Sequence, residues 1–208
     1  MPTVPLKIEV MLDLETMSSK RNAAIVAIGA VKMDMRAVDH AQHLNAGHPD
    51  LPSGEAPPFI VDSFAIGVNL KSCQAVGLHV DGDTVMWWLR QSDAARVALC
   101  PTGNEKDLPT LYDALLKFNA WFGLDSLPVW GNGSDFDNVI LANAYDAIGA
   151  PPPWKYSHNR CFRTLKNLVP PTATLAPPPN EKAHDALADA TWQAQYLFNI
   201  QKHLGWAL

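Results

Sequence analysis

The 208-residue sequence contains little cysteine, and its three cysteines lie far apart in the chain (Cys73, Cys100 and Cys161). An odd number of widely spaced cysteines, without a CxxC pair, indicates neither a disulfide framework nor a thiolate zinc site. Long apolar runs are also missing, since no stretch approaches the ~20 apolar residues that a membrane-spanning helix needs. The opening MPTVPLKIEV lacks the basic start and apolar run of a signal peptide. We therefore expect a soluble, intracellular protein that does not enter a membrane.

Basic charge is scarce as well. The chain has 16 lysine and arginine residues against 21 aspartate and glutamate residues, and its net charge is −5. This balance argues against a protein that coats nucleic acid non-specifically, because phosphate binding normally requires a basic surface. It does not exclude a nuclease. Carboxylates that hold metal ions count as negative in the sequence, yet with divalent ions bound they attract phosphate.

Composition and length indicate a folded domain. Apolar residues make up 48% of the chain and charged residues 18%, as in globular proteins rather than in disordered, charge-rich chains. Single domains commonly contain about 50–250 residues. We therefore predict one domain over residues 1–208.

Three apolar segments predict the first strands, at Ile8–Leu14, Ile25–Met33 and Phe64–Leu70. We expect these strands to form a meander. The segment between the second and the third, residues 36–60, is rich in proline, glycine and histidine and is predicted to be an insertion loop. Its composition does not indicate whether it covers a site, binds a partner or is only a variation in loop length.

The rest of the chain alternates helices and strands. A helix is predicted from Asp83, with Asp83 or Thr84 as its N-cap. The elements expected after it are a helix at Leu108–Phe122, a strand at 127–130, a helix at Asp135–Ala147, a short strand at Asn159–Phe162, and a last helix in which Leu187, Ala190, Ala194, Leu197 and Phe198 form one apolar face. This order predicts an α/β domain with a mixed sheet.

Acidic residues occur at the end of the first predicted strand. Asp13 and Glu15 are two residues apart, so the pleat of a strand directs both carboxylates to the same face. Two carboxylates on a rigid strand can hold a hard divalent cation such as magnesium. A short DxE motif also occurs by chance, and acidic residues that end a strand at its solvent edge have the same pattern.

A second acidic pair follows the predicted strand at 127–130. Asp135 and Asp137 flank Phe136 in the first turn of a helix, after a loop that contains Asn132. Both aspartates are also what the positive end of a helix dipole favours. Phe136 belongs to the apolar face of the helix, and Asn132 is suited either to bonding its own loop or to binding a ligand.

The last helix begins near a histidine and an aspartate. His184 and Asp189 are five residues apart, which is about 140° around a regular helix, so they cannot converge if both lie within it. They can converge if His184 precedes the first turn. We therefore expect the helix to start near Asp185, with Asp185 as a capping residue.

Taken in order, a strand DxE, a helix that opens with FD and a last helix that opens with H-x4-D, the motifs resemble those of the DEDDh exonucleases of the ribonuclease H-like superfamily. The resemblance extends from Asp13 to Asp189. The stretches TVMWWLRQSDAAR (84–96) and CFRTLKNL (161–168) are similar to a branch found in phage and prophage genomes and among bacterial exoribonucleases. The resemblance implies an α/β, ribonuclease H-like fold with a mixed five-stranded sheet flanked by helices.

The resemblance also implies an activity and a set of site residues. It implies a 3′-to-5′ exonuclease that hydrolyses single-stranded DNA or RNA, releases nucleoside 5′-monophosphates, uses two divalent cations (Mg²⁺ or Mn²⁺) and acts in the cytoplasm of a bacterium or of a phage-infected cell. Homodimers are frequent in the family. By position, the metal ligands would be Asp13, Glu15, Asp137 and Asp189, and the general base would be His184. Asp137 is preferred to Asp135 because it follows Phe136 as in the family motif.

Contacts to the substrate are less defined. The resemblance implies that the backbone near Thr16 and the side chain of Met17 lie against the terminal nucleotide; a buried Met17 with no opening beside it would oppose this. Many family members have a histidine–asparagine pair where this chain has Asn132 and Gly133. Asn132 and Phe136 are the other candidate substrate-binding residues, and this departure from the family pattern leaves their contacts to the terminal nucleotide undecided.

Other residues allow two interpretations. Trp87 and Trp88 are suited to stacking with bases or to core packing, and we assign Trp88 to the core. Arg96 and Arg163 are suited to phosphate contacts or to structural ion pairs. The sequence does not distinguish DNA from RNA, and two alternatives remain: a hydrolase of very short oligoribonucleotides and an inactive nucleic-acid-binding module of the same fold.

Overall fold

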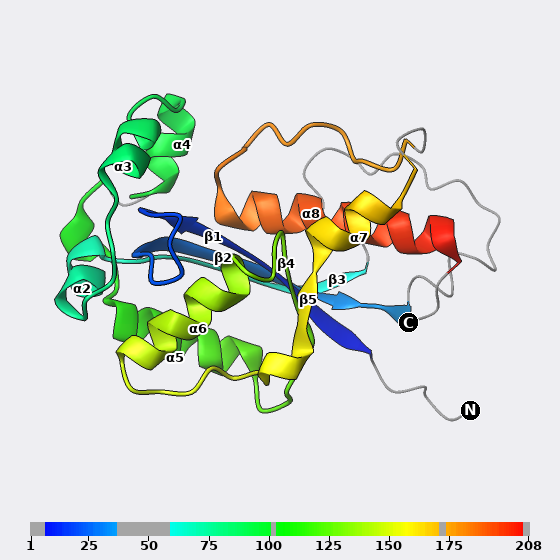
Figure 1. Ribbon diagram of the computed structural model, residues 1–208, viewed down its shortest axis with the longest axis horizontal. Coiled ribbons are helices and arrows are strands. Elements are labelled where there is room, and N and C mark those ends of the chain that lie inside the picture. The colour runs from blue at the N-terminus through cyan, green and yellow to red at the C-terminus, as the bar shows by residue number, and fades with distance from the viewer. Residues whose placement is uncertain (1–6, 37–58, 101–102, 171–173, 206–208) are drawn as a thin grey trace.

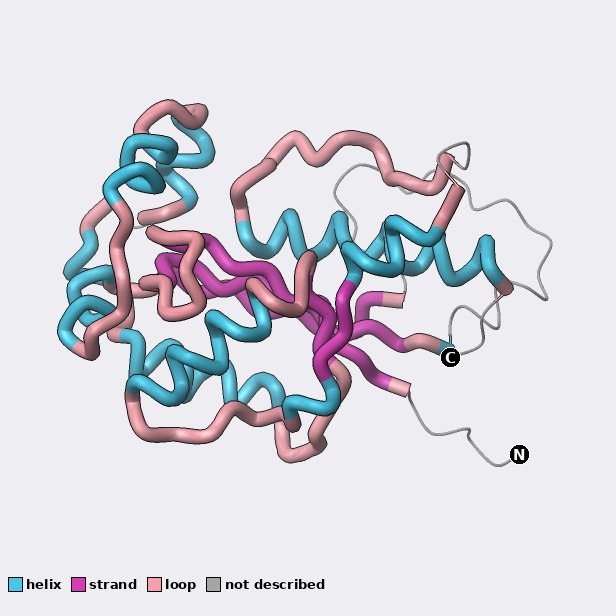
Figure 2. Tube along the Cα trace, in the orientation of Figure 1, coloured by secondary structure: helices cyan, strands magenta, loops and turns pink. Residues whose placement is uncertain are grey.

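A five-stranded mixed sheet with helices on both faces forms the centre of the protein (Figures 1 and 2). The computed structural model describes residues 7–36, 59–100, 103–170 and 174–205. The predicted insertion at 36–60 lies almost entirely outside the described residues. Among the described helices, none combines the length and the apolar character that crossing a bilayer requires.

The strand order is β3-β2-β1-β4-β5. The first three strands form an antiparallel meander, and the last two run parallel to β1: β1 (Ile8–Thr16), β2 (Ile25–Asp34), β3 (Ile60–Gly67), β4 (Val129–Gly131) and β5 (Asn159–Cys161). The predicted meander and mixed α/β sheet are therefore confirmed.

One face of the sheet is covered by α5 (Leu111–Phe122) and α6 (Asp137–Ala147) (Figure 1). Alternate residues of β1, which include Val10 and Leu12, join Phe118 of α5 in a buried cluster on this side. Such alternation follows from the two-residue repeat of a strand. The intervening residues of β1 therefore face the opposite side.

That opposite face is covered by α7 (Phe162–Leu168) and α8 (Ala186–Leu204) (Figure 1). Met11 of β1 and Val31 of β2 pack there with Leu197 of α8. Since Asp13 and Glu15 follow Met11 at intervals of two residues, they share this face with α8.

Three short helices gather at the end of the sheet where β1 ends (Figure 1). They are α2 (Leu70–Ala75), α3 (Gly82–Trp88) and α4 (Asp93–Ala98). The prediction that β3 spans Phe64–Leu70 was wrong, because Leu70 begins α2. The side chain of Asn69 accepts a hydrogen bond from the Ser72 amide at 3.1 Å and so caps this helix.

Two helices start at other residues than predicted, because their capping residues differ from those expected. The N-cap of α3 is Asp81, not Asp83 or Thr84, because its carboxylate accepts from the Asp83 amide at 2.8 Å. Helix α5 starts at Leu111, not at Leu108, because Thr110 caps it and a short 3₁₀ turn, η1 (Glu105–Asp107), precedes it.

Two more boundaries differ near the parallel strands. Helix α6 begins at Asp137, not at Asp135. Phe162, predicted to end a strand, begins α7, and a second 3₁₀ turn, η2 (Tyr156–His158), precedes β5. The Cys161 thiol accepts from the Thr164 amide at 3.4 Å and caps α7. No disulfide bond joins any of the three cysteines, all of which lie in the described part of the chain.

Gly29 of β2 determines how closely α8 approaches the sheet. A Cβ atom at this position would lie 2.1 Å from the carbonyl carbon of Ala186 and 2.3 Å from the Leu187 nitrogen. Because these are backbone atoms, no side-chain adjustment can relieve the overlap. The first turn of α8 therefore rests directly on the backbone of β2.

We expect Gly29→Ala to lower the free energy of unfolding by about 3 kcal/mol, because the new methyl group must displace α8 or β2. Denaturant unfolding followed by circular dichroism measures this change. Gly82→Ala is the matched control, since a Cβ at Gly82 would meet open space. Equal stability of the two variants would contradict the close contact between α8 and β2.

Candidate active site

The carboxylates of Asp13 and Glu15 lie at the end of β1, on the face that α8 covers. Asp13 pairs with Gly29 across the sheet, so it lies beside the point where α8 touches β2. Its Oδ1 accepts a hydrogen bond of 2.7 Å from Nε2 of Gln193, a buried residue of α8. Glu15 is 8% exposed. The predicted DxE pair therefore lies under the last helix, with Glu15 buried and Asp13 half-buried, and not at a solvent edge.

The start of α8 brings His184 and Asp189 together. Asp185 is the N-cap, as predicted, and its carboxylate accepts from the Ala188 amide at 3.0 Å. His184 precedes the helix in the left-handed region, with a φ of 69°. Its backbone N–H donates to Oδ2 of Asp189 at 2.8 Å. The expected convergence of the two residues, with His184 before the first turn, is thus present.

Asp137 joins the site from the other side of the sheet. It is the first residue of α6 and is 3% exposed. Its Oδ1 accepts from the Leu14 amide of β1 at 3.2 Å, and its Oδ2 accepts from the Asn132 amide at 3.1 Å. A Cβ at Gly131 would lie 3.2 Å from Oδ2 of Asp137 and 2.3 Å from an Asn138 oxygen, so glycine leaves room for this carboxylate.

The four carboxylates form an electrostatically unfavourable cluster. Burial, with repulsion from Asp137, Glu15 and Asp189, holds the pKa of Asp13 well above its usual range. Burial and repulsion from Asp189 and Asp137 raise the pKa of Glu15 to about 8. Burial also raises the pKa of Asp137 to about 7, although its backbone hydrogen bonds oppose the shift. A cluster of buried and half-buried carboxylates suits hard divalent cations, which would relieve the repulsion.

His184 lies next to this cluster. Ligand atoms of Glu15, His184 and Asp189 all lie within 4.8 Å of one another. The imidazole also contacts two tryptophans of α3 edge to face, with ring centroids 5.0 Å away for Trp87 and 5.9 Å for Trp88. Trp88 is 4% exposed, as expected for a core residue, and Trp87 is 38% exposed.

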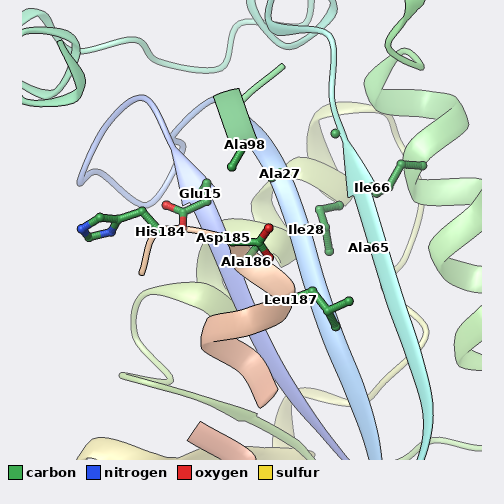
Figure 3. Close-up of a pocket in the computed structure, with 11 residues that line it drawn as sticks. Glu15, Ala27, Ile28, Ala65, Ile66, Ala98, His184, Asp185, Ala186 and Leu187 are labelled. Atoms are coloured by element: carbon green, nitrogen blue, oxygen red, sulfur yellow. The ribbon is translucent and has the colours of Figure 1, made fainter. Parts of the chain in front are cut away.

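A pocket opens beside Glu15 and His184 (Figure 3). Its volume is about 230 Å³, and most of its lining is apolar. Strands β2 and β3 contribute to the lining, as does Ala98 of α4. A small apolar pocket that meets a cluster of acids is suited to a ligand with an apolar part and an anionic part.

Thr16 and Met17, which were predicted to contact the terminal nucleotide, lie at the end of β1 and directly after it. The Thr16 hydroxyl donates to the Ser18 carbonyl at 2.8 Å, and the Thr16 carbonyl accepts from the Trp88 indole at 3.0 Å. Met17 is 8% exposed, belongs to the core and does not line the pocket beside Glu15. The burial of Met17 counts against its contact with a nucleotide.

Asn132 and Phe136 lie at the entrance to α6. Asn132 is partly buried, and its Oδ1 has no hydrogen-bond partner among the described residues. Phe136 packs partly against the core. Asp135, the competitor of Asp137, is exposed. The structure thus brings Asp137, and not Asp135, into the acidic cluster.

Two further residues, Asn180 and Gln193, contact the site but were not predicted from the sequence. Asn180 donates from Nδ2 to Oδ1 of Asp189 at 2.7 Å, and Gln193 donates to Asp13. Gln193 could have been identified from the sequence, because it is a polar residue on the apolar face of α8, one turn after Asp189. No local pattern distinguishes Asn180 from the other polar residues of its proline-rich loop. Arg96 has the structural role that was one of its two interpretations, because it pairs with Asp93 and donates to backbone carbonyls.

Comparisons with known proteins agree with this geometry. Residues 8–201 match the model of the Rv2179c-like family, described as a 3′-5′ exoribonuclease Rv2179c-like domain. No curated protein matches the chain in sequence.

Among solved structures, the chain is similar to E. coli exonuclease I. The zinc-bound complex of that enzyme with single-stranded DNA has a TM-score of 0.61 and 12% identity, covering 97% of this chain and 42% of exonuclease I. Its complex with a dT13 oligonucleotide has a TM-score of 0.59 and 13% identity, covering 96% and 42%. The chain therefore spans less than half of exonuclease I. At this identity the likeness shows the fold, and it confirms the predicted ribonuclease H-like fold.

The raised pKa values predict how the metal-free protein responds to pH. The carboxyls of Glu15 and Asp137 ordinarily titrate near 4.5 and 3.8 and here near 8 and 7. Protonation therefore favours the folded state, and this stabilisation, complete below about pH 4, is lost as the pH rises through 7 to 8. We expect the Tm in a chelator to fall by about 5 °C or more between pH 5 and pH 8, and Mg²⁺ or Mn²⁺ to restore it at pH 8.

Differential scanning calorimetry measures this effect. Asp137→Asn should weaken the dependence on pH, whereas the exposed Asp135→Asn should leave it as in the unaltered protein. A Tm that rises between pH 5 and pH 8 without metal would contradict the electrostatic description of the cluster.

Proposed function

The chain belongs to the family of 3′-5′ exoribonuclease Rv2179c-like domains, and from this premise we propose that it hydrolyses single-stranded nucleic acid from the 3′ end with the aid of divalent metal ions. One observation carries the proposal: carboxylates from β1, α6 and α8 converge beside a single histidine. Nucleoside 5′-monophosphates are the expected products.

Asp13, Glu15, Asp137 and Asp189 would hold two divalent cations, Mg²⁺ or Mn²⁺. All four offer carboxylate oxygens, which these hard cations prefer, and their mutual repulsion supplies the negative field that a cation needs. When bound, such ions supply two kinds of assistance to phosphodiester hydrolysis, since they lower the pKa of water and stabilise charge on the leaving oxygen.

The protein's own groups would control the proton and the geometry. The His184 imidazole lies among Glu15 and Asp189, close enough to accept a proton from a water molecule that attacks a phosphodiester there. The His184 backbone N–H donates to Asp189, which fixes the position of the residue. Trp87 packs edge to face against the imidazole and orients the ring. An oriented base loses less entropy when it reaches the reacting water.

The apolar pocket beside Glu15 supports recognition of a chain end. The pocket is too small for a folded nucleic acid, but its volume of about 230 Å³ suits part of one nucleoside. Ala27 of β2 and Ala65 of β3, which line the pocket, offer apolar contact to a sugar or base (Figure 3). A terminal nucleoside seated there would present its phosphate to the acidic cluster.

The test of this function is hydrolysis of matched 5′-labelled single-stranded RNA and DNA in Mg²⁺ or Mn²⁺. We expect a ladder that shortens from the 3′ end and is absent with Asp13→Ala. The substrate that is hydrolysed faster, RNA or DNA, shows the sugar preference. Activity confined to the shortest oligoribonucleotides would favour the narrower alternative function, and no cleavage under any of these conditions would refute the proposal.

The division of labour between base and metal ligand gives a second prediction. His184→Ala should lower kcat by about 10²- to 10⁴-fold while it keeps most Mn²⁺ binding, because its imidazole moves a proton. Asp13→Ala should lose both activity and Mn²⁺ binding. Isothermal titration with Mn²⁺ and kinetics on one oligonucleotide measure the two effects, with Asp135→Ala as the control. Equal loss of Mn²⁺ binding in the His184 and Asp13 variants would assign His184 to the metal ligands instead.

A further inference from the structure

One segment of the chain contains basic residues but no acidic ones. Residues 147–180 contain no aspartate or glutamate, so all 21 acidic residues of this negatively charged chain lie elsewhere. The same segment contains Lys155, Arg160, Arg163 and Lys166. It includes β5 and α7, which follow the edge of the sheet next to β4 (Figure 1).

These cations are not neutralised by neighbouring acids. Among the described residues, none of the four forms an ion pair, whereas Lys71 pairs with Glu105 and Arg96 with Asp93. Arg160 donates to the backbone carbonyls of Ser157 and Asn159, and the Lys166 ammonium lies 5.7 Å from the centre of the Phe162 ring. Their positive charge therefore remains for a ligand from solution.

Arg163 connects this segment to the candidate active site. Its Nη2 donates to the carbonyl oxygen of Asn132 at 2.5 Å, and the amide of Asn132 donates to Asp137. Gly133 makes room for the guanidinium, because a Cβ there would lie 3.2 Å from Cζ and Nη1 of Arg163. The guanidinium is thus fixed at the rim of the site, one residue away from a carboxylate of the acidic cluster.

The fixed guanidinium retains capacity for an anion. Arg163 is exposed, and its contact with Asn132 occupies one edge of a planar group that can donate several hydrogen bonds. Arginine in such a position suits the paired oxygens of a phosphate, and it binds them with more directional preference than lysine does. Its charge also opposes the burial that raises the pKa of Asp137, which agrees with its proximity to the cluster.

We propose that Arg163 binds the first phosphate on the 5′ side of the scissile bond, and that Arg160 and Lys166 bind phosphates further along the same strand. This proposal rests on the proposed exonuclease function and adds the path of the substrate. The scissile phosphate lies at the acidic cluster, the terminal nucleoside lies on the His184 side, and the strand leaves across β5 and α7. The acid-free segment explains how a protein of net charge −5 attracts a polyanion.

The test compares Arg163→Gln with Lys117→Gln on a dinucleotide, a trinucleotide and a dodecanucleotide. Lys117 is the matched control because it is exposed on α5, on the opposite face of the sheet. For the dodecanucleotide, Arg163→Gln should raise KM about tenfold with a smaller change in kcat, and Arg163→Lys should recover part of the loss. The slope of log KM against log salt should fall by about 0.7, as expected when one phosphate contact to a single strand is lost.

Substrate length separates this role from a structural one. The increase in KM for Arg163→Gln should be larger with the trinucleotide than with the dinucleotide, because the dinucleotide lacks the second phosphate. The double variant Arg160→Gln with Lys166→Gln should affect the dodecanucleotide most. If Arg163→Gln lowers kcat equally for substrates of all three lengths, the proposal is wrong. Arg163 would then act by stabilising the loop that contains Asn132. An unaltered protein that cleaves none of the substrates would instead refute the exonuclease function itself.

Discussion

The contact between the first turn of α8 and β2 at Gly29 is the constraint on which the candidate site depends. Because this residue has no side chain, the helix backbone rests on the sheet directly beside Asp13. The N-terminal end of α8 therefore brings His184 and Asp189 to a strand more than 150 residues earlier in the chain. A larger residue at this position would push the start of α8, and with it His184, away from the carboxylates of β1.

The same packing brings four carboxylates together, two of them buried, so that solvent screens their repulsion only in part. The fold offsets part of this cost with hydrogen bonds that all donate to the carboxylates: backbone amides serve Asp137, and side-chain amides serve Asp13 and Asp189. These donors stabilise the ionised forms of the three aspartates, whereas burial and the repulsion from neighbouring carboxylates keep the pKa of Glu15 raised. Under the proposed function, the residual negative field would favour multivalent cations, and it would link function to a loss of stability in the metal-free protein.

Charge is separated across the site rather than spread evenly over the surface. The four carboxylates of the site gather beside the start of α8, whereas β5, from the acid-free part of the sequence, forms the edge of the sheet next to β4. Arg163 joins the two regions through the Asn132 backbone. If the proposed function holds, this arrangement would give the reacting phosphate and the rest of the strand different electrostatic surroundings, a difference that the net charge does not reveal.

The sequence by itself determined the local features. Period-two alternation placed Asp13 and Glu15 on one face, and the capping pattern at Asp185 placed His184 before the last helix, because both features depend on residues only a few positions apart. Short elements such as α7 were missed, since a helix of two turns has too little periodicity to be recognised. Only the tertiary structure decided that Asp137 bonds to Leu14 and that Gln193 bonds to Asp13, because residues 123 and 180 positions apart meet through packing of separate elements, which no local pattern encodes.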